Sequence, residues 1–535
     1  MTTNTKLVCF TNCLLALEDG TLVPRDLWID SELGLILDAQ HTFFAARTRP
    51  SRVVDLHGAI LAPGLLDIQI NGAFGFDFSI YNNNEGIPDT PEEESRADKD
   101  YLDSLVRVAD RITETGVTGF NVQIGPDHCY AAKGNLPQAA VSVSSQDTPH
   151  GAHLLGWHAE APMLGHMDHS AMIAAYHENH LRAFLAACQK GRSHISFFDL
   201  CTRRISSFEA VYGSTALDKH TGGVRIITAA PELEGVLGSV APLAERGVVV
   251  SIGHSIAPTP IATAAVAHGA RLITHLFNAM PQLHHRDPSI IGLLGSSQAG
   301  KGDAVGVPRP SHAAYAPGKA PPESVSTLGG KSLLKKISTV NLTSPTKSEQ
   351  KHEVSEALQE LITPPQTPLG RSPAVGPTPS ILMAIPHSIE PLERPFYGMI
   401  VDGIHSHPNS VKLAYTAYPE GCVLVTDAMS MLDPHLPDGV HEWRDGKRLV
   451  KSGDKLFIEA RHTRWKCIRN FMAFTSCTLG DAIKCATYNP AKCLGIEARK
   501  GTLRAGADAD LVVMTAEGEI LSTWVSGKGR LVQIG

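Results

Sequence analysis

Short apolar runs alternate with longer amphipathic stretches through the middle of this chain. Five of these runs end in polar side chains or lead directly into them: HLLGWHAEA, VRIITAAPE, GVVVSIGHS, RLITHLFNAM and CVLVTDAM. Each precedes or follows a stretch of helix length, and strands that alternate with helices build a parallel sheet with crossover connections. The number of units favours a closed barrel. We therefore predict an α/β fold, a (β/α)8 TIM-like barrel, whose catalytic groups lie where the strands finish.

Both ends of the chain show a different pattern, with short β-like runs separated by turn residues. Near the N-terminus these are KLVCFTNCLLAL and DLWIDSELGLILDAQ, then a strand-like stretch at Val53–Leu61 and a turn at Pro63–Gly64. The C-terminal runs GTLRAGADADLVVM and ILSTWVSGKGRLVQIG have the same character. We expect one small β domain from residues 1–62 and 497–535, and a catalytic barrel from residues 63–295 and 396–496.

The segment 296–395 interrupts the barrel pattern. It is rich in Ser, Pro, Gly, Thr and Lys, and it contains repeated SP and TP dipeptides. A segment of this composition buries too little apolar surface to offset its conformational entropy. We predict a disordered insertion, in which SEQKHEVSEALQELI has the pattern of a transient helix.

Composition and charge narrow the class of protein. Of 535 residues, 43% are hydrophobic and 19% are charged, which suits a globular protein with a large core. A formal net charge of -7 and a pI near 6.4 provide no basic surface for nucleic-acid phosphates or anionic lipid headgroups. Neither nucleic acid nor membrane is therefore an expected partner.

The cysteines and the N-terminal segment bear on the compartment. Ten cysteines are scattered from Cys9 to Cys493 without a CxxC pair, so neither a disulfide framework nor a cysteine zinc site is expected. The start of the chain, MTTNTKLVCFTNCLLALEDG, has a single Lys and a short apolar run broken by polar residues, unlike a secretory signal. No uncharged apolar run reaches the roughly 18 residues that span a bilayer. These features favour a cytoplasmic protein.

Metal-capable side chains lie at the ends of three predicted strands. WHAEAP contributes Glu160, SIGHS contributes His254 and ITHLFNAM contributes His275. One carboxylate with two imidazoles suits zinc or another borderline divalent ion, and three protein ligands leave a position for water. A single His or Glu is more often a structural group, and the chain has 25 histidines. Each residue taken alone therefore leaves its role open.

A fourth segment, VLVTDAM, places Asp427 just after an apolar run. Amide hydrolysis by a metal-activated water needs a base for the water proton and an acid for the leaving nitrogen, and one Asp can serve as both. The alternative is a strand-end aspartate that caps a helix N-terminus. The residues by themselves leave both roles open.

Longer motifs occur in a distinctive order: APGLLDIQINGAFGFDF, TAAPELEG, VVVSIGHS, THLFNAMPQLHHRDPSIIGLLG, DGIHSHP, LVTDAM, and ATYNPAKCLGI with GTLRAGADADLVVM. Together they resemble the N-acetylglucosamine-6-phosphate deacetylase family of the amidohydrolase superfamily. The match covers most of Leu61–Gly295 and Tyr397–Val513. THLFNAMP, followed by the arginine of HHRDP, is highly specific.

The resemblance implies a reaction and its chemical groups. The reaction is hydrolysis of N-acetylglucosamine 6-phosphate to glucosamine 6-phosphate and acetate, in amino-sugar catabolism. Glu160, His254 and His275 would hold one divalent ion per subunit, with zinc as the expected ion. Asp427 would be the proton-transferring carboxylate. Family members commonly pair as dimers, so we also expect a homodimer.

The resemblance also implies a set of substrate contacts. These are Asn278, Ala279, Arg286, Asp402, Gly403, Ile404 and His405. Arg286 suits the 6-phosphate because a guanidinium forms paired charge-assisted bonds to phosphate oxygens. Its alternative role is a surface salt bridge, which contributes little stability.

The first predicted barrel strand bears on the number of metal ions. Many amidohydrolases carry His-x-His there for a second metal, whereas this chain has Gln69 and Asn71 in the segment DIQIN. We infer one catalytic metal, with Gln69 as a residue that helps to order the site. The alternative for both residues is a hydrogen-bonded core amide.

Two patches depart from the family pattern. After Glu160, Ala161 replaces a glycine, and neither His166 nor His169 aligns with the substrate-contacting histidine of the family. In KLFIEARHTRWKCIRNF, the bulky Arg461, His462 and Trp465 stand where relatives have a loop of small residues. Remodelled loops and errors in the gene sequence both explain such patches.

Three functions therefore compete. The deacetylase is the leading one. A different metal-dependent amidohydrolase, acting on a cyclic amide or a nucleobase, would have no phosphate for Arg286 to bind. A catalytically silent protein that binds a sugar phosphate is supported by the two divergent patches and opposed by the intact metal ligands and Asp427.

Overall fold

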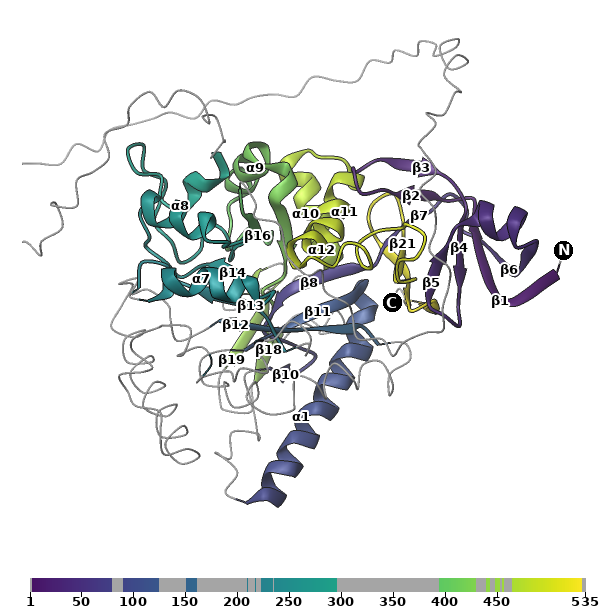
Figure 1. The fold of residues 1–535 in the computed structure, drawn as a ribbon, viewed down its shortest axis with the longest axis horizontal. Helices are drawn as coiled ribbons and strands as arrows, with labels where there is room; N and C mark the ends of the chain where they lie inside the picture. The colour runs from purple at the N-terminus through teal and green to yellow at the C-terminus, as the bar shows by residue number, and fades with distance from the viewer. Residues whose placement is uncertain are drawn as a thin grey trace, which may run out of the picture. The chain divides into compact units, whose positions relative to one another are not determined.

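The computed structural model describes residues 2–78, 90–124, 151–160, 209, 217, 223–233, 235–295, 394–429, 439–442, 448–452, 455–456 and 464–531. Its main element is an eight-stranded sheet whose neighbouring strands are all parallel (Figure 1). In sheet order the strands are β17 (Cys422–Val425), β16 (Phe396–Ile400), β15 (Leu272–Ile273), β14 (Val249–Ile252), β13 (Val224–Ala229), β12 (His153–Glu160), β11 (Val117–Ile124) and β8 (Leu65–Ile70).

The first and last strands of this sheet meet through the residues at their carboxyl ends. The backbone N–H of Asp427 donates to the carbonyl of Gln69 at 2.9 Å. The N–H of Asn71 donates to the carbonyl of Ala428 at 2.7 Å. These bonds join β17 to β8 and close the sheet, which confirms the predicted (β/α)8 barrel.

Successive residues of the barrel strands belong to two different apolar clusters. Ile226 and Val249 pack in a cluster with residues of helix α12 (Tyr488–Leu494). Their neighbours in sequence, Ile227 and Val250, belong to a second and larger apolar cluster. Because side chains alternate along a strand, both faces of this sheet are buried, and buried parallel strands appear in sequence as continuous apolar runs.

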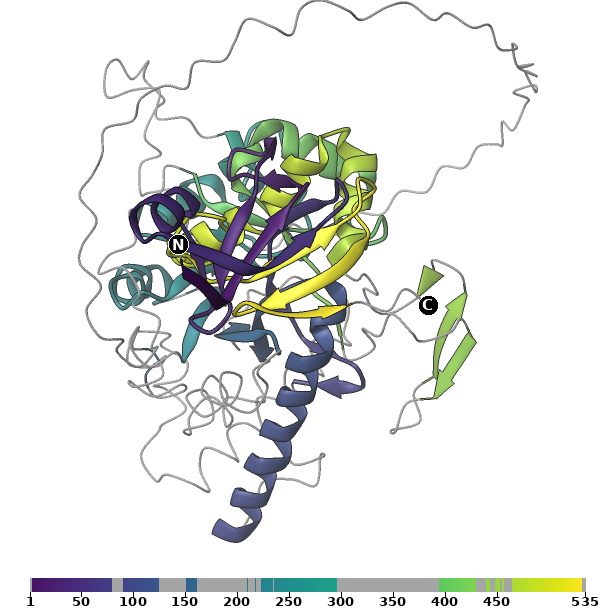
Figure 2. The same cartoon turned by 90° about the vertical axis from the view of Figure 1, so that its right-hand side faces the viewer.

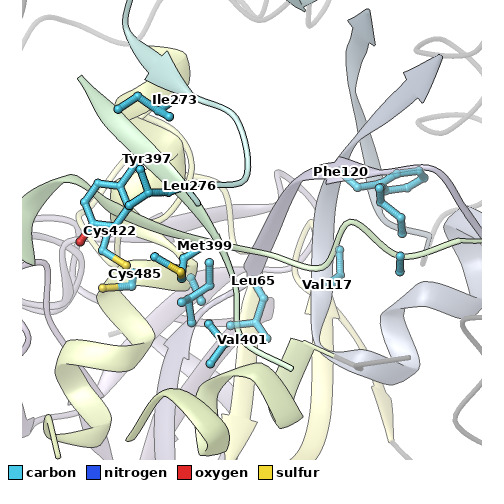
Figure 3. Close-up of a cluster of buried hydrophobic side chains, with 14 of the residues drawn as sticks. Leu65, Val117, Phe120, Ile273, Leu276, Tyr397, Met399, Val401, Cys422 and Cys485 are labelled. Atoms are coloured by element: carbon cyan, nitrogen blue, oxygen red, sulfur yellow. The ribbon is translucent and has the colours of Figure 1, made fainter. Parts of the chain in front are cut away.

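The larger cluster connects the sheet to the surrounding helices. Figure 3 shows its Leu65 and Val117 on one side and Tyr397 with Cys422 on the other. Cys485 of α11 (Leu479–Ala486) lies against Cys422, and burial raises its thiol pKa well above the ordinary value. No disulfide bond joins two of the described cysteines, and all of these but Cys477 are buried, as expected for structural core thiols.

Some of the described helices begin at residues whose side chains accept from free backbone N–H groups. Thr90 Oγ1 accepts from Glu93 N at 3.2 Å, and Pro91 follows at the first helical position. Thr478 and Asp481 form a reciprocal capping box at the start of α11. The other helices of the described residues are α1 (Pro91–Ile112), α7 (Val236–Glu245), α8 (Thr259–Ala267), α9 (Pro408–Ala417) and α10 (Arg464–Thr475). Short single-turn helices are η1 (His41–Ala45), η3 (Thr113–Thr115), η5 (Ile291–Gly295) and η6 (Pro419–Gly421).

Both ends of the chain share one six-stranded sheet, as predicted for the small β domain. Strand β7 pairs with β2 on one side and β21 on the other, and Figure 2 shows the purple and yellow strands side by side. In order the strands are β23 (Lys528–Leu531), β22 (Ile520–Val525), β21 (Leu511–Met514), β7 (Ile60–Pro63), β2 (Leu14–Ala16) and β3 (Leu22–Pro24). The domain boundaries stay a prediction.

A second terminal sheet contains β5 (Leu35–Leu37), β4 (Leu27–Asp30), β1 (Thr2–Thr11) and β6 (Thr48–Asp55). The single strand predicted at Val53–Leu61 is wrong, because β6 ends at Asp55 and β7 begins at Ile60. Between them His57 and Gly58 have φ angles of 49° and 84°. This left-handed turn moves the chain from one terminal sheet to the other.

Smaller elements complete the described structure. They are β9 (Gly72–Ala73) with β10 (Phe76–Asp77), and a sheet of β18 (Gly439–Glu442), β19 (Arg448–Ser452) and β20 (Lys455–Leu456). The insertion predicted at 296–395 lies outside the described residues except for its last two positions. A search of the described helices finds none with the length and apolar character to cross a membrane.

A buried ion cluster joins the barrel to the terminal strands. Lys500 Nζ lies 2.9 Å from Asp508 Oδ2 and also contacts Asp510 Oδ2. His153, at the start of β12, lies 3.6 Å from the same Asp510 oxygen. Burial alone would raise the pKa of Asp510, but the Lys500 charge holds it well below its usual range.

We predict that Lys500→Met lowers the free energy of unfolding at pH 7 by about 3–5 kcal/mol, because the buried Asp510 loses its lysine cation, whereas Asp508 keeps its pair with Arg499. The parent's stabilisation by Asp510 exists above the unfolded-state pKa and disappears as pH falls toward the lower folded-state pKa. The loss should therefore shrink in acid. Urea unfolding at several pH values measures it. Lys6→Met, which breaks the exposed Lys6–Glu32 pair, is the control and should change stability by about 0–1 kcal/mol; equal losses would contradict the prediction.

Candidate active site

Three barrel strands deliver side chains to one point. Glu160 is the last residue of β12, and His254 and His275 follow the ends of β14 and β15. Glu160 Oε1 lies 2.8 Å from His254 Nε2 and 3.5 Å from His275 Nε2. The two Nε2 atoms are 3.0 Å apart. The structure thus brings the three predicted metal ligands together.

The backbone turns sharply at the residues that carry the chemistry. The φ angles of His254, His275 and Asp427 are 47°, 28° and 47°. Such left-handed conformations cost about 1–3 kcal/mol each for residues with a Cβ atom, and they cluster at active sites. The bond from Asp427 N to Gln69 O, 2.9 Å long, helps to hold one of these turns. A left-handed backbone conformation at each of these three residues therefore directs side chains from three different strands into the site.

The donor set fits a divalent metal ion. The ligand atoms of Glu160, His254 and His275 all lie within 4.8 Å of one another. Among the described residues, the buried Glu160 Oε1 has no hydrogen-bond partner despite the close imidazoles. An acceptor oxygen without a donor, beside two imidazole nitrogens, is an arrangement that a cation satisfies. One carboxylate and two histidines are also a ligand set that zinc uses.

The charges of these residues favour a cation in the same place. Burial alone would raise the pKa of Glu160, but His254 and His275 hold it well below its ordinary value. Burial alone would lower the pKa of His275, but the Glu160 carboxylate raises it to about 9. Binding of a metal ion at this place would therefore compete with protonation of His275.

Beneath the ligands, a chain of hydrogen bonds crosses the barrel interior. His158 Nδ1 lies 3.1 Å from the carbonyl of Ile68, which only accepts, so Nδ1 carries the proton. Burial lowers the pKa of His158 to about 4, so the ring is neutral and its Nε2 accepts from Thr228 Oγ1 at 2.8 Å. Thr274 Oγ1 links Thr228 to Ser251, at 2.8 and 2.5 Å. This series of hydrogen bonds fixes the register of the strands that carry the metal ligands.

Asp427 lies within electrostatic reach of Glu160 and His275. Its Oδ1 accepts from Asn71 Nδ2 at 2.8 Å. Burial raises the pKa of the Asp427 carboxyl, and the charge of Glu160 adds to the rise, whereas His275 and Asn71 oppose it. A carboxylate with a raised pKa is a stronger base, which suits proton transfer at neutral pH.

The predicted segment Asp402–His405 lies after β16. Asp402 Oδ2 accepts from His405 Nδ1, and its Oδ1 accepts from the backbone N–H groups of Ile404 and His405, both at 2.8 Å. The bond to Asp402 raises the pKa of His405, and the charge of Asp427 adds to it. Ile404 is 55% exposed, and Gly403 has a φ of 75°. The segment therefore presents an imidazole with a raised pKa within electrostatic reach of Asp427.

The remaining predicted substrate contacts lie after β15. Asn278 N donates to the carbonyl of His275 at 2.9 Å, and the carbonyl of Ala279 accepts from Ser255 N at 3.2 Å. The Arg286 side chain is exposed, and among the described residues its guanidinium has no polar partner. Asp287 anchors this loop by accepting from Thr259 Oγ1 at 2.6 Å. Because Asp287 is anchored, the backbone position of the adjacent Arg286 is held as well.

Two supporting residues were missed by the sequence-based site assignment. Gln123 Nε2 donates to Glu160 Oε2. Glu232 Oε2 accepts from Ser255 Oγ at 2.6 Å, next to His254. A signal for Gln123 exists in GFNVQI, where polar residues interrupt a buried strand. Of the predicted Gln69, the carbonyl binds Asp427 N, and the buried Nε2 has no partner among the described residues.

The first divergent patch and the middle of the second lie outside the described residues. The first, from Ala161 onward and including His166 and His169, lies there entirely. So do Arg461 and His462 of the second patch. Trp465 falls in the first turn of α10, which begins at Arg464.

The parallel barrel, with an acidic and imidazole cluster at the carboxyl ends of its strands, defines the class of protein as an amidohydrolase. The Amidohydrolase family profile matches residues 387–530. The chain is 32% identical over 528 residues to N-acetylglucosamine-6-phosphate deacetylase of Bos taurus, covering 98% of this chain and 95% of that protein. It is likewise 32% identical over 531 residues to the Homo sapiens protein of that name, covering 98% and 95%. The chain therefore belongs to the N-acetylglucosamine-6-phosphate deacetylase family, which confirms the resemblance.

A solved structure agrees in fold. It is an N-acetyl-D-glucosamine-6-phosphate deacetylase variant from Mycobacterium smegmatis, in complex with N-acetyl-D-glucosamine-6-phosphate. The two align with a TM-score of 0.55 at 19% identity, covering 98% of this chain and 99% of that one. At this identity the likeness concerns the fold.

We predict that His254→Ala and His275→Ala each abolish metal retention, because two remaining ligands hold a hydrated divalent ion too weakly. Elemental analysis of dialysed protein measures bound metal per chain. His268→Ala is the control, since that exposed histidine bonds only to its own helix at Ala264 O among the described residues. Stoichiometric metal in either site variant would overturn the ligand assignment.

Proposed function

We propose that this protein hydrolyses N-acetylglucosamine 6-phosphate to glucosamine 6-phosphate and acetate. The observation that carries the proposal is the convergence of Glu160, His254 and His275 beside Asp427 at the carboxyl ends of the barrel strands. The Bos taurus and Homo sapiens relatives bear the name of this activity. The three metal-capable side chains and the carboxylate for proton transfer are present, which favours an enzyme over a silent sugar-phosphate binder.

The metal ion has one task in this proposal. Glu160, His254 and His275 would hold one divalent ion per subunit, zinc by the chemistry of the ligands, and the ion would supply Lewis acidity toward the acetyl carbonyl. The Gln69 and Asn71 side chains on the first strand offer no imidazole for a second ion. By family resemblance, the protein would act as a cytoplasmic homodimer.

Asp427 moves the proton. Its carboxylate takes a proton from the attacking water, and the resulting acid later gives that proton to the departing amine nitrogen. Asn71 occupies Oδ1 with a hydrogen bond of 2.8 Å, so the other oxygen is the one available for transfer. The raised pKa assists both steps, because a stronger base accepts the proton and the acid persists long enough to return it.

The substrate's phosphate would be held away from the metal. Arg286 is exposed on the loop after β15, close in sequence to Asn278 and Ala279. Its guanidinium complements a phosphate in charge and in hydrogen-bonding geometry. His405, whose pKa is raised by Asp402, adds an imidazole on the segment after β16 that binds a proton more readily than a free one. Binding energy from the phosphate would then orient the acetamide toward the reacting groups.

We predict that the parent protein, supplied with Zn²⁺, releases acetate from N-acetylglucosamine 6-phosphate. Asp427→Asn should retain its metal and lose turnover by about 100-fold or more, because an amide cannot accept the water proton. Acetate release by an enzyme-coupled assay, with bound metal measured in the same samples, tests both. A parent that binds metal but releases no acetate would refute the proposed reaction. An active Asp427→Asn would remove Asp427 from its role.

We predict that Arg286→Ala lowers kcat/KM for the phosphorylated sugar much more than for free N-acetylglucosamine. The loss should be about 1.5–3 kcal/mol, the scale of hydrogen bonds to a charged group. Steady-state kinetics with both sugars measures the preference. Arg25→Ala, at an exposed arginine beside β3, is the control and should leave it unchanged. A preference undiminished in Arg286→Ala would reopen the substrate class.

A further inference from the structure

The second carboxylate oxygen of Glu160 has its own partner. Oε1 faces the two imidazoles, whereas Oε2 accepts a hydrogen bond from Gln123 Nε2. Gln123 lies on β11, in register with His158 of the adjacent β12, and is only 2% exposed. The two carboxylate oxygens of Glu160 therefore have different partners.

The chemistry of the two groups fixes the orientation of the amide. An ionised carboxylate only accepts hydrogen bonds, so Gln123 must present its NH₂ group to Glu160. The reverse orientation would place two acceptors against each other in a buried site, which costs free energy. In the structure it is the Nε2 atom of Gln123 that faces Glu160 Oε2. The contact is thus a charge-assisted hydrogen bond, stronger than one between neutral groups.

We propose that Gln123 is a positioning residue that keeps Glu160 oriented with one oxygen toward the metal site. With Oε2 engaged by Gln123, only Oε1 is available to a metal ion. Coordination through a single carboxylate oxygen leaves more positions for water and for the substrate carbonyl. A partner that orients a ligand in this way contributes to metal affinity without touching the ion. The inference rests on the proposed metal-ligand role of Glu160.

A purely structural role for Gln123 predicts a different behaviour, and the same strand supplies the comparison. Asn121 lies two residues earlier, fully buried, and its Nδ2 donates to the backbone carbonyl of Gly156 at 3.2 Å. Among the described residues, the amide oxygens of Asn121 and Gln123 are both buried without a partner. The two residues therefore match in strand, burial and hydrogen bonding, and differ in whether the acceptor belongs to a metal ligand.

The test compares Gln123→Met with Asn121→Leu in the full chain. Each replaces a buried amide by an apolar side chain of similar size. Zn²⁺ affinity is measured by competition with a chromophoric chelator, and the visible absorption of the Co²⁺-loaded protein reports the ligand geometry. Gln123→Met should lose about 10–100-fold in Zn²⁺ affinity and show an altered Co²⁺ spectrum. Asn121→Leu should lose thermal stability while keeping the parent's affinity and spectrum.

Each outcome decides one point. Parental affinity and spectrum in Gln123→Met would overturn the inference, and so would equal metal losses in both variants. A parent chain that binds no Zn²⁺ would instead refute the proposed metal site. If Gln123→Met does not fold, Gln123→Asn takes its place, since its shorter amide keeps the polarity but cannot reach Glu160. The same affinity loss is then expected, and parental affinity would overturn the inference.

Discussion

The ionised carboxylate of Glu160, buried beside two imidazoles, is the interaction on which the rest of the site depends. A buried charge costs several kcal/mol unless it is paired and hydrogen-bonded. Here the imidazoles of His254 and His275 face one oxygen, and Gln123 donates to the other. The barrel must hold these groups in place, because loss of one partner leaves the charge uncompensated.

Closure of the barrel and its inner hydrogen bonds provide that rigidity. The carboxyl ends of β17 and β8 are joined by backbone bonds, which also place Asp427 against Asn71. Beneath the site, the chain from Ser251 through Thr274 and Thr228 to His158 has a single direction, because it ends on a backbone carbonyl. Such a fully satisfied buried network specifies one register of the strands.

The backbone of the site is strained at three residues, and the surrounding fold compensates for this strain. Positive φ angles at His254, His275 and Asp427 are unfavourable for these residues by themselves. Strands buried on both faces and the network below them over-determine the backbone, so the strain is retained. The ligands are consequently close together before any metal binds, which reduces the ordering needed on binding.

Much of this protein was determined by its sequence alone. Continuous apolar runs predicted buried parallel strands, because both faces of each strand are covered, and the polar groups at their ends gave Glu160, His254, His275 and Asp427. The terminal β domain and the family followed from local patterns and motifs in the same way. The errors were also local: Val53–Leu61 contains two strands, because a left-handed turn at His57 and Gly58 interrupts one apolar run.

Only the tertiary structure decided which polar side chains meet. Asn71 and Asp427 are 356 residues apart and touch because the barrel closes between its first and last strands. Gln123 reaches Glu160 through the register of β11 against β12, and Asp510 meets His153 across the junction of two sheets. Hydrogen-bond partners depend on pairing and register, which are set by long-range packing and leave no periodic signal in the chain.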